Sequence, residues 1–429
     1  MALSLTSASA LLECSLFRQP PWPPRSSKPK TVLSQIARHS LSHMSYHTGT
    51  QSAENKEVVD LGGALMKLTN NSTCKMVMST SCSENGDEAA RIREMMMRTL
   101  GLATKVSYGD VLGPLKRLGF WLYGKQLAEV SLEFDELLEE MLKEHEKKGE
   151  RKELDFMDLL LKVYQDDQAE LKITRTQIKA FLLLVNYSTL CLTGSNFMLL
   201  WCEDLFIGGT ISSTETMQWT MAKLINHPDI FNKVRQEIKS VVGNSRLVGE
   251  KDIPNLPYLQ EVVKESLRLY PPSPVIIRKC RQNCKIKGFD IPQGVMVATN
   301  VYAIMRDIEI WDSPNEFRPE RFLASSNQVH DSVEYNDQGP QTNEQNFNYA
   351  PFGGGRRRCP GSAVALILVN TAIATMVQCF DWKVGKKGDG DEANKVNMEI
   401  GAGISLPMAY PLELLPIIHF NPFVYFSIL

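Results

Sequence analysis

The sequence lacks a strong excess of charge of either sign. Its 429 residues include 47 Lys and Arg against 49 Asp and Glu, which gives a formal net charge of −2. Because nucleic-acid binding depends on a broad basic surface, no nucleic-acid partner is predicted. A hydrophobic share of 43% with 22% charged residues instead indicates a globular chain with a large core.

Paired cysteine motifs are also missing. The nine cysteines are odd in number and scattered, and Cys280 and Cys284 have no second pair that would close a zinc site. A disulfide scaffold and a structural zinc module are therefore not predicted. A reducing compartment, or the cytosolic face of a membrane, fits this cysteine usage.

The first fifty residues have few acids and no long apolar run. They carry five Lys or Arg and a single acid, Glu13, among many serines and prolines. No N-terminal membrane anchor is predicted. This composition is typical of an organelle transit peptide, but an unstructured tail has the same composition. We expect an atypical segment over 1–56, disordered or transit-like, and one domain over 57–429.

The most informative stretch is FGGGRRRCPG at 352–361, which precedes a long apolar segment. Cys359 lies on a glycine-rich loop at a predicted helix start, where unpaired N–H groups and the helix dipole stabilise a thiolate. Gly355 and Gly361 allow close approach of a flat, bulky group, and Arg357 can pair with carboxylates on it. These features indicate a haem site. A flexible basic loop or a buried structural cysteine is the alternative for the loop alone.

This stretch resembles the cysteine loop of the cytochrome P-450 superfamily, F-x-x-G-x-R-x-C-x-G, at every fixed position. The resemblance implies a mainly α fold with small β-sheets, a bound haem b (iron protoporphyrin IX), and Cys359 as the axial ligand of its iron. It also makes Arg278 a candidate partner for a haem propionate. The matching residues are Phe352, Gly355, Arg357, Cys359 and Gly361.

A second motif, GGTISS at 208–213, resembles the family pattern A/G-G-x-D/E-T-T/S on a long helix over the haem. The resemblance implies that Gly208 and Gly209 open the helix for dioxygen and that Ser212 assists at this distal face. Ile211 stands where the family has a proton-relaying acid. Slow or uncoupled turnover is expected unless ordered water or Glu215 substitutes. A plain buried helix with a Gly-Gly break is the reading if this motif stands alone.

The third motif joins a Glu and an Arg on one predicted helix, 258–270. Glu265 and Arg268 are three residues apart, so the two side chains can pair. An E-x-x-R sequence is weak by itself, but FRPERF follows at 317–322. The resemblance implies that Arg321 completes a buried triad that braces the cysteine loop. Buried charges persist only as a mutually satisfied set, so the predicted role is structural.

Other patterns predict the surrounding elements. A helix is expected from Glu57 with an interruption at 69–72, and another over 127–148 with Leu132 facing inward. Asp155 is expected to cap the next helix. Residues 284–300 read as short strands. The segments 400–406 and 412–420 are expected to form a hairpin near the active site.

Residues 180–202 carry no charge over a length that could span a bilayer, although a buried helix pair is an equally good reading. In family chains, the segment that resembles Lys179-Ala180 is followed almost directly by the segment that resembles the one at Asp204. In this chain, residues 181–203 separate the two. We therefore expect an insertion over 182–203.

Several phrases resemble plant microsomal members of the superfamily, in the group with flavone synthase II, pterocarpan hydroxylases and triterpene oxidases. The resemblance implies a haem-thiolate monooxygenase that oxidises a small apolar or phenolic plant metabolite, flavonoid- or triterpenoid-like, with O2. It further implies electrons from an NADPH–cytochrome P-450 reductase and a place at the cytosolic face of the endoplasmic reticulum membrane. A plastid or soluble location is the alternative. The phrases are NLPYLQ at 255–260, VYAIMRD at 301–307 and MVQCFDW at 376–382.

Family chains begin with a membrane anchor, a proline-rich hinge, strands, and a helix that grips a haem propionate. Residues 1–56 resemble none of these. We expect an N-terminally truncated chain, and the alternative function is an inactive relative with weak or no haem binding. The carbon-monoxide difference spectrum of the reduced protein separates these readings.

Overall fold

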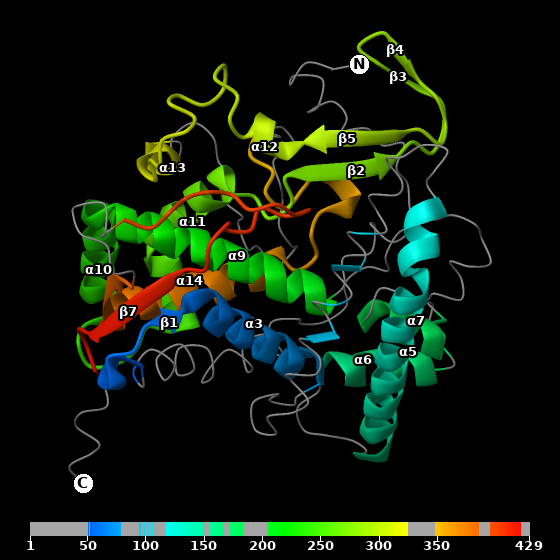
Figure 1. The fold of residues 1–429 in the computed structure, drawn as a ribbon, viewed down its shortest axis with the longest axis horizontal. Helices are drawn as coiled ribbons and strands as arrows, with labels where there is room; N and C mark the ends of the chain where they lie inside the picture. The colour runs from blue at the N-terminus through cyan, green and yellow to red at the C-terminus, as the bar shows by residue number, and fades with distance from the viewer. Residues whose placement is uncertain are drawn as a thin grey trace. The chain divides into compact units, whose positions relative to one another are not determined.

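The computed structural model describes part of the chain, and these residues fall into two compact units (Figure 1). The larger unit holds the described residues between 42 and 65 and from 215 onward, and the smaller those between 66 and 214. Helices α3 (Leu61–Met78) and α9 (Leu205–Asn226) contribute to both. Most of the leader and of the 182–203 insertion lies outside the described residues, which are 50, 52–78, 94–95, 98, 101–102, 105, 117–148, 155–166, 168, 172–182, 205–324, 348–385 and 395–421.

Three helices form the centre of the larger unit. Helices α10 (Pro228–Val242) and α11 (Pro257–Leu269) pack against each other and against α14 (Ser362–Cys379). Within the described part of the chain, α14 alone is long and apolar enough to cross a membrane, and 67% of it is buried, as in a core helix. The shorter helices are η3 (Glu250–Asn255), α12 (Val301–Ile304), α13 (Glu320–Ala324) and η5 (Gly355–Arg357).

The C-terminal strand joins a three-stranded antiparallel sheet, ordered β1 (Val59–Asp60), β7 (Glu413–Ile418), β6 (Phe380–Val384). The predicted hairpin between 400–406 and 412–420 is therefore wrong, and Ile400 forms an isolated bridge with Met408 instead. Prolines at 407 and 411 lie between the two segments and have no N–H group to donate to a ladder.

Two small sheets lie between α11 and the cysteine loop in sequence. One pairs β2 (Val275–Lys279) with β5 (Met296–Asn300), and the other pairs β3 (Cys284–Ile286) with β4 (Phe289–Ile291), both antiparallel. Strands β3, β4 and β5 confirm the short strands predicted over 284–300, whereas β2 was not predicted. The β3–β4 hairpin projects beyond the β2–β5 sheet (Figure 1), and its turn residues Lys287 and Gly288 have φ values of 45° and 84°.

The smaller unit contains α5 (Arg117–Lys148), α6 (Phe156–Gln165) and α7 (Arg175–Leu182). The inward face predicted for α5 is confirmed at four positions but wrong at Leu132, whose side chain is 64% exposed. The confirmed core positions of α5 are Leu137, Leu138, Met141 and Leu142.

The predicted cap of α6 is also confirmed. The Asp155 carboxylate accepts from the Asp158 N–H at 2.8 Å, and the Asp158 carboxylate accepts from the Asp155 N–H at 3.2 Å.

The break predicted at 69–72 is absent, since α3 runs through it without interruption. The hydroxyl groups there bond to α9 and to the backbone of α3. Thr69 Oγ1 lies 2.9 Å from Thr214 Oγ1 of α9, and the Ser72 hydroxyl donates to the Leu68 carbonyl at 2.8 Å. Residues that favour turns in water are tolerated inside this helix because their hydroxyls are bonded when buried.

Candidate functional site

The cysteine loop is a tightly turned segment that ends at Gly361, directly before α14. The Cys359 N–H donates to the Phe352 carbonyl at 3.0 Å and closes the loop on itself. Gly353 and Gly355 have φ values of 71° and 65°, in the left-handed region that favours glycine. Cys359 is half-buried and lies three residues before Ser362, at the positive end of the α14 dipole.

Arg278 of β2 lies against this loop. Its Nη2 donates to the Arg357 carbonyl at 3.3 Å and its Nη1 to the Ile277 carbonyl at 2.9 Å. The Arg357 side chain itself is exposed. The structure therefore brings the two predicted propionate partners together through the Arg357 backbone, and it uses Arg278 to hold the loop in place.

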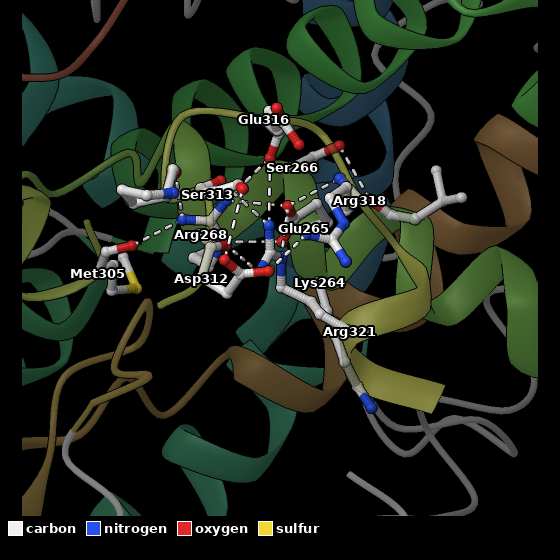
Figure 2. Close-up of polar contacts among 12 residues, drawn as sticks. Lys264, Glu265, Ser266, Arg268, Met305, Asp312, Ser313, Glu316, Arg318 and Arg321 are labelled. Atoms are coloured by element: carbon white, nitrogen blue, oxygen red, sulfur yellow. Dashed lines mark hydrogen bonds and ion pairs between the residues drawn. The ribbon is translucent and has the colours of Figure 1, made fainter. Parts of the chain in front are cut away.

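The triad predicted from sequence is assembled around Glu265 (Figure 2). Arg268 donates from Nε and Nη2 to the two Glu265 oxygens at 2.7 and 2.8 Å, and Arg321 donates from Nε at 3.0 Å. The side chains of Glu265 and Arg268 are fully buried and that of Arg321 is 10% exposed. Both arginines also bind backbone carbonyls, so the buried charges are satisfied. The acceptors are Met305, Pro314 and Glu316 for Arg268, and Asp312, Ser313 and Glu316 for Arg321.

Tyr349 connects α11 to the start of the cysteine loop. Its hydroxyl donates to the Lys264 carbonyl at 3.1 Å, and its ring packs edge-on against Phe322. Lys264 directly precedes Glu265, so the triad and the segment that leads into the loop are fixed to the same turn of α11. The sequence motifs did not indicate Tyr349, because a lone aromatic residue in a loop carries no spacing signal.

The second motif lies on the first turns of α9. A Cβ atom added at Gly209 would lie 3.2 Å from Thr73 Oγ1, so this glycine allows α3 and α9 to approach closely. The Ser212 hydroxyl donates to the Gly208 carbonyl one turn earlier. The motif glycines and hydroxyl thus have local structural partners, and the side chain of Ile211 is half-buried and apolar.

Glu215 follows Ile211 by one turn of α9 and is buried, with 7% of its surface exposed. Its Oε1 accepts from the Ser405 hydroxyl at 2.6 Å, whereas its Oε2 has no hydrogen-bond partner among the described residues. Burial raises the pKa of Glu215 to about 7, against the opposing effect of the Ser405 hydrogen bond. The carboxyl group can therefore hold a proton near neutral pH. Ser405 was not predicted from sequence, since its contact spans 190 residues.

Comparison with known proteins decides the family. The family model described as Cytochrome P450 matches residues 198–405. The soybean (Glycine max) 3,9-dihydroxypterocarpan 6A-monooxygenase is 36% identical over 376 residues, which cover 86% of this chain and 67% of that protein. The chain belongs to the cytochrome P-450 family. A second relative, Cytochrome P450 705A5 of Arabidopsis thaliana, is 44% identical over 87% of this chain.

The chain spans about two thirds of the length of these P-450 relatives, with 66% of the Arabidopsis protein covered. Its structure is similar to that of a zebrafish cytochrome P-450 solved with progesterone, with a TM-score of 0.66. The two chains are 23% identical, and the match covers 90% of this chain and 80% of the zebrafish chain. The predicted fold, mainly helical with small sheets, is confirmed.

Haem is the cofactor of this P-450 family, and the residues of the cysteine loop fit it. A Cβ atom at Gly361 would lie 3.9 Å from the Cys359 sulfur, so glycine leaves one side of the sulfur open. The first turns of α14, from Ser362 to Ile367, are only half-buried although nearly all apolar, whereas the rest of the helix is buried. A half-buried thiol beside a half-buried apolar stretch matches a flat, apolar group with a soft-metal centre.

Proposed function

We propose that this chain is a haem-thiolate monooxygenase. Cys359 is the proposed axial ligand of the iron, and Phe352, Gly355, Gly361, Arg357 and Arg278 form the proposed cofactor site. The observation that carries the proposal is the closed cysteine loop, which presents a half-buried sulfur at the start of α14. Haem held there would supply oxygen-activating chemistry, favoured by electron donation from the thiolate.

The chain's own residues have supporting roles in this proposal. The helix dipole of α14 stabilises the Cys359 thiolate, and Arg278 fixes the loop through the Arg357 carbonyl at 3.3 Å. The triad of Glu265, Arg268 and Arg321 has a structural role at α11. Gly208, Gly209 and Ser212 are the proposed distal residues on α9, and Ser212 retains an acceptor oxygen while its hydroxyl donates to Gly208.

The proposed substrate is a small apolar or phenolic plant metabolite, flavonoid- or triterpenoid-like. Support comes from the relative named as a 3,9-dihydroxypterocarpan 6A-monooxygenase, which matches 86% of this chain. The proposed electron source is an NADPH–cytochrome P-450 reductase, and the proposed location is the cytosolic face of the endoplasmic reticulum membrane. A plastid or soluble location is the alternative.

A reconstituted assay tests this function. The full chain is expressed in microsomes with a plant reductase and NADPH, supplied with a panel of flavonoids, pterocarpans and triterpenes, and products are detected by mass spectrometry. The expected product carries one added oxygen atom, requires both NADPH and O2, and contains ¹⁸O from labelled O2. A chain that binds little or no haem and gives no oxygenated product would support the second candidate, an inactive relative with weak or no haem binding. The apolar Ile211 favours this candidate on the side of activity.

A further inference from the structure

Cys280 and Cys284 form a close pair of thiols at the end of β2. Their sulfur atoms lie 3.7 Å apart, and neither sulfur is in a disulfide. The Cys280 thiol also donates to the Gln282 carbonyl at 2.9 Å. The sequence showed this pair only as half of a zinc site, because four residues of separation do not reveal whether a bend brings two sulfurs into contact.

Both cysteines are held by backbone hydrogen bonds. The Cys280 N–H donates to the Val295 carbonyl and its carbonyl accepts from the Gly294 N–H, each at 2.8 Å. Cys284 begins β3 and is in register with Ile291 of β4. The backbone on either side of the bend is therefore held in place, and the sulfur separation of 3.7 Å has to shorten to the ~2 Å of an S–S bond.

The two thiols differ in exposure. Cys280 is 2% exposed, whereas Cys284 is half-buried and follows the exposed residues 281–283. A dissolved oxidant therefore reaches Cys284 first, and Cys280 lies behind it as the second thiol. This order is that of a peroxide-reactive cysteine with a resolving partner.

We propose that Cys280 and Cys284 form a reversible disulfide when the chain meets a hydroperoxide. In the first step the Cys284 sulfur attacks hydrogen peroxide, the O–O bond breaks, and a sulfenic acid and one water form. In the second step the Cys280 sulfur attacks the sulfenic sulfur, the S–S bond forms, and a second water leaves. The two thiols lose two electrons and two protons, the peroxide is reduced, and a dithiol reverses the change.

The location connects this pair to the cysteine loop. Cys280 directly follows β2, and β2 carries Arg278, whose guanidinium donates to the Arg357 carbonyl. The bend is thus adjacent in sequence to the strand that holds the loop. The disulfide itself does not depend on whether the chain is an active monooxygenase.

Peptide mapping tests the proposal because trypsin cuts after Lys279, Arg281 and Lys285 and so separates the two cysteines. The full chain is reduced, treated with hydrogen peroxide, alkylated and digested without reductant. We expect the peptides 280–281 and 282–285 to appear joined, with two hydrogen atoms fewer than their sum, and to separate after dithiothreitol treatment. Recovery of both as separate alkylated peptides after oxidation would overturn the proposal.

Two serine variants and one internal control complete the test. In Cys280→Ser we expect dimedone to trap a sulfenic acid at Cys284, and in Cys284→Ser we expect Cys280 to stay available for alkylation. The proposal would also be overturned if peroxide made Cys280 unavailable for alkylation as fast in Cys284→Ser as in the parent. Cys379 is the internal control, since it is fully buried and burial raises its thiol pKa to about 12, so it should stay reduced.

Discussion

Glu215 is a carboxyl group in an environment that disfavours its charge. It receives one hydrogen bond, from Ser405 at 2.6 Å, and no described residue bonds its second oxygen. An ionised carboxylate needs more partners than this when buried. The protonated form is therefore preferred in the folded chain, and this preference couples folding to pH.

We predict that the unfolding free energy falls as pH rises from about 4.5 to above 7 because of Glu215. Its folded pKa, about 7, lies above the reference value of 4.5, so the stabilisation is complete at low pH and lost on deprotonation. The loss is on the order of 3 kcal/mol, at 1.36 kcal/mol per pKa unit. Urea unfolding at several pH values measures it.

The matched variants are Glu215→Gln and Glu413→Gln. The first removes the buried titration and should flatten the pH dependence over this window. The second removes an exposed carboxylate and should leave the dependence intact. Equal slopes in the parent and Glu215→Gln would contradict the assignment.

Ile211 gives a prediction about turnover. Because an isoleucine cannot transfer a proton, the parent should oxidise NADPH with little product. Ile211→Asp should raise the ratio of product formed to NADPH consumed several-fold. Ile211→Asn should not, because asparagine is similar in size to aspartate but has no acidic group. Well-coupled product formation by the parent would show that proton delivery does not need residue 211.

Removing Arg268 should be strongly destabilising. Arg268→Met leaves the fully buried Glu265 carboxylate without its bidentate partner, and breaking a buried pair in this way costs about 3–5 kcal/mol. Arg318→Met removes an exposed pair with Asp312 and is the control, with a small expected change. Similar urea midpoints for the two variants would contradict the structural role assigned to the triad.

At the scale of elements, the junction between α5 and α6 depends on one buried histidine. His145 Nδ1 lies 2.9 Å from the Met141 carbonyl, and Nε2 lies 2.9 Å from Asp155 Oδ2. Both ring nitrogens face acceptors, which only the protonated imidazolium can satisfy together. Burial lowers the pKa of His145, but the contacts with Asp155 and Met141 outweigh it and the net shift is upward.

We predict that this junction loosens as pH rises through the pKa of His145, above 6.5. The folded pKa is raised, so the stabilisation is complete below the unfolded value and lost above the folded one. Hydrogen exchange of the first α6 amides, corrected for intrinsic rates, should become several-fold faster over this range. His145→Gln should remove the pH dependence. Asp155→Asn keeps a capping side chain without the charge and should also flatten it.

Elements that depend on residues close together in sequence could be predicted, whereas elements that depend on contacts between distant residues could not. The Asp155 cap and the short strands followed from signals within a few residues. The unbroken α3 did not, because Thr69 is stabilised inside the helix by Thr214, 145 residues away. Leu132 was assigned inward from helical spacing, and its 64% exposure shows that spacing alone does not identify which stripe of α5 is covered.

For the whole molecule, the cysteine loop and the triad were predictable because their residues occur in compact motifs. The Glu265 network joined residues from two such motifs, and the structure places them within hydrogen-bond distance. Arg278 and Ser405 were harder, since their partners Arg357 and Glu215 are 79 and 190 residues away. A sequence pattern within one segment contains no information about contacts between residues so far apart.

The central claim is that the sulfur of Cys359 binds the iron of a haem. The most direct measurement is the carbon-monoxide difference spectrum of the reduced full chain, beside Cys359→Ser and the control Cys379→Ser. We predict the red-shifted Soret band of thiolate-ligated iron for the parent and for Cys379→Ser, and its loss in Cys359→Ser. A parent without bound haem, or a Cys359→Ser variant with the parent's spectrum, would contradict the account.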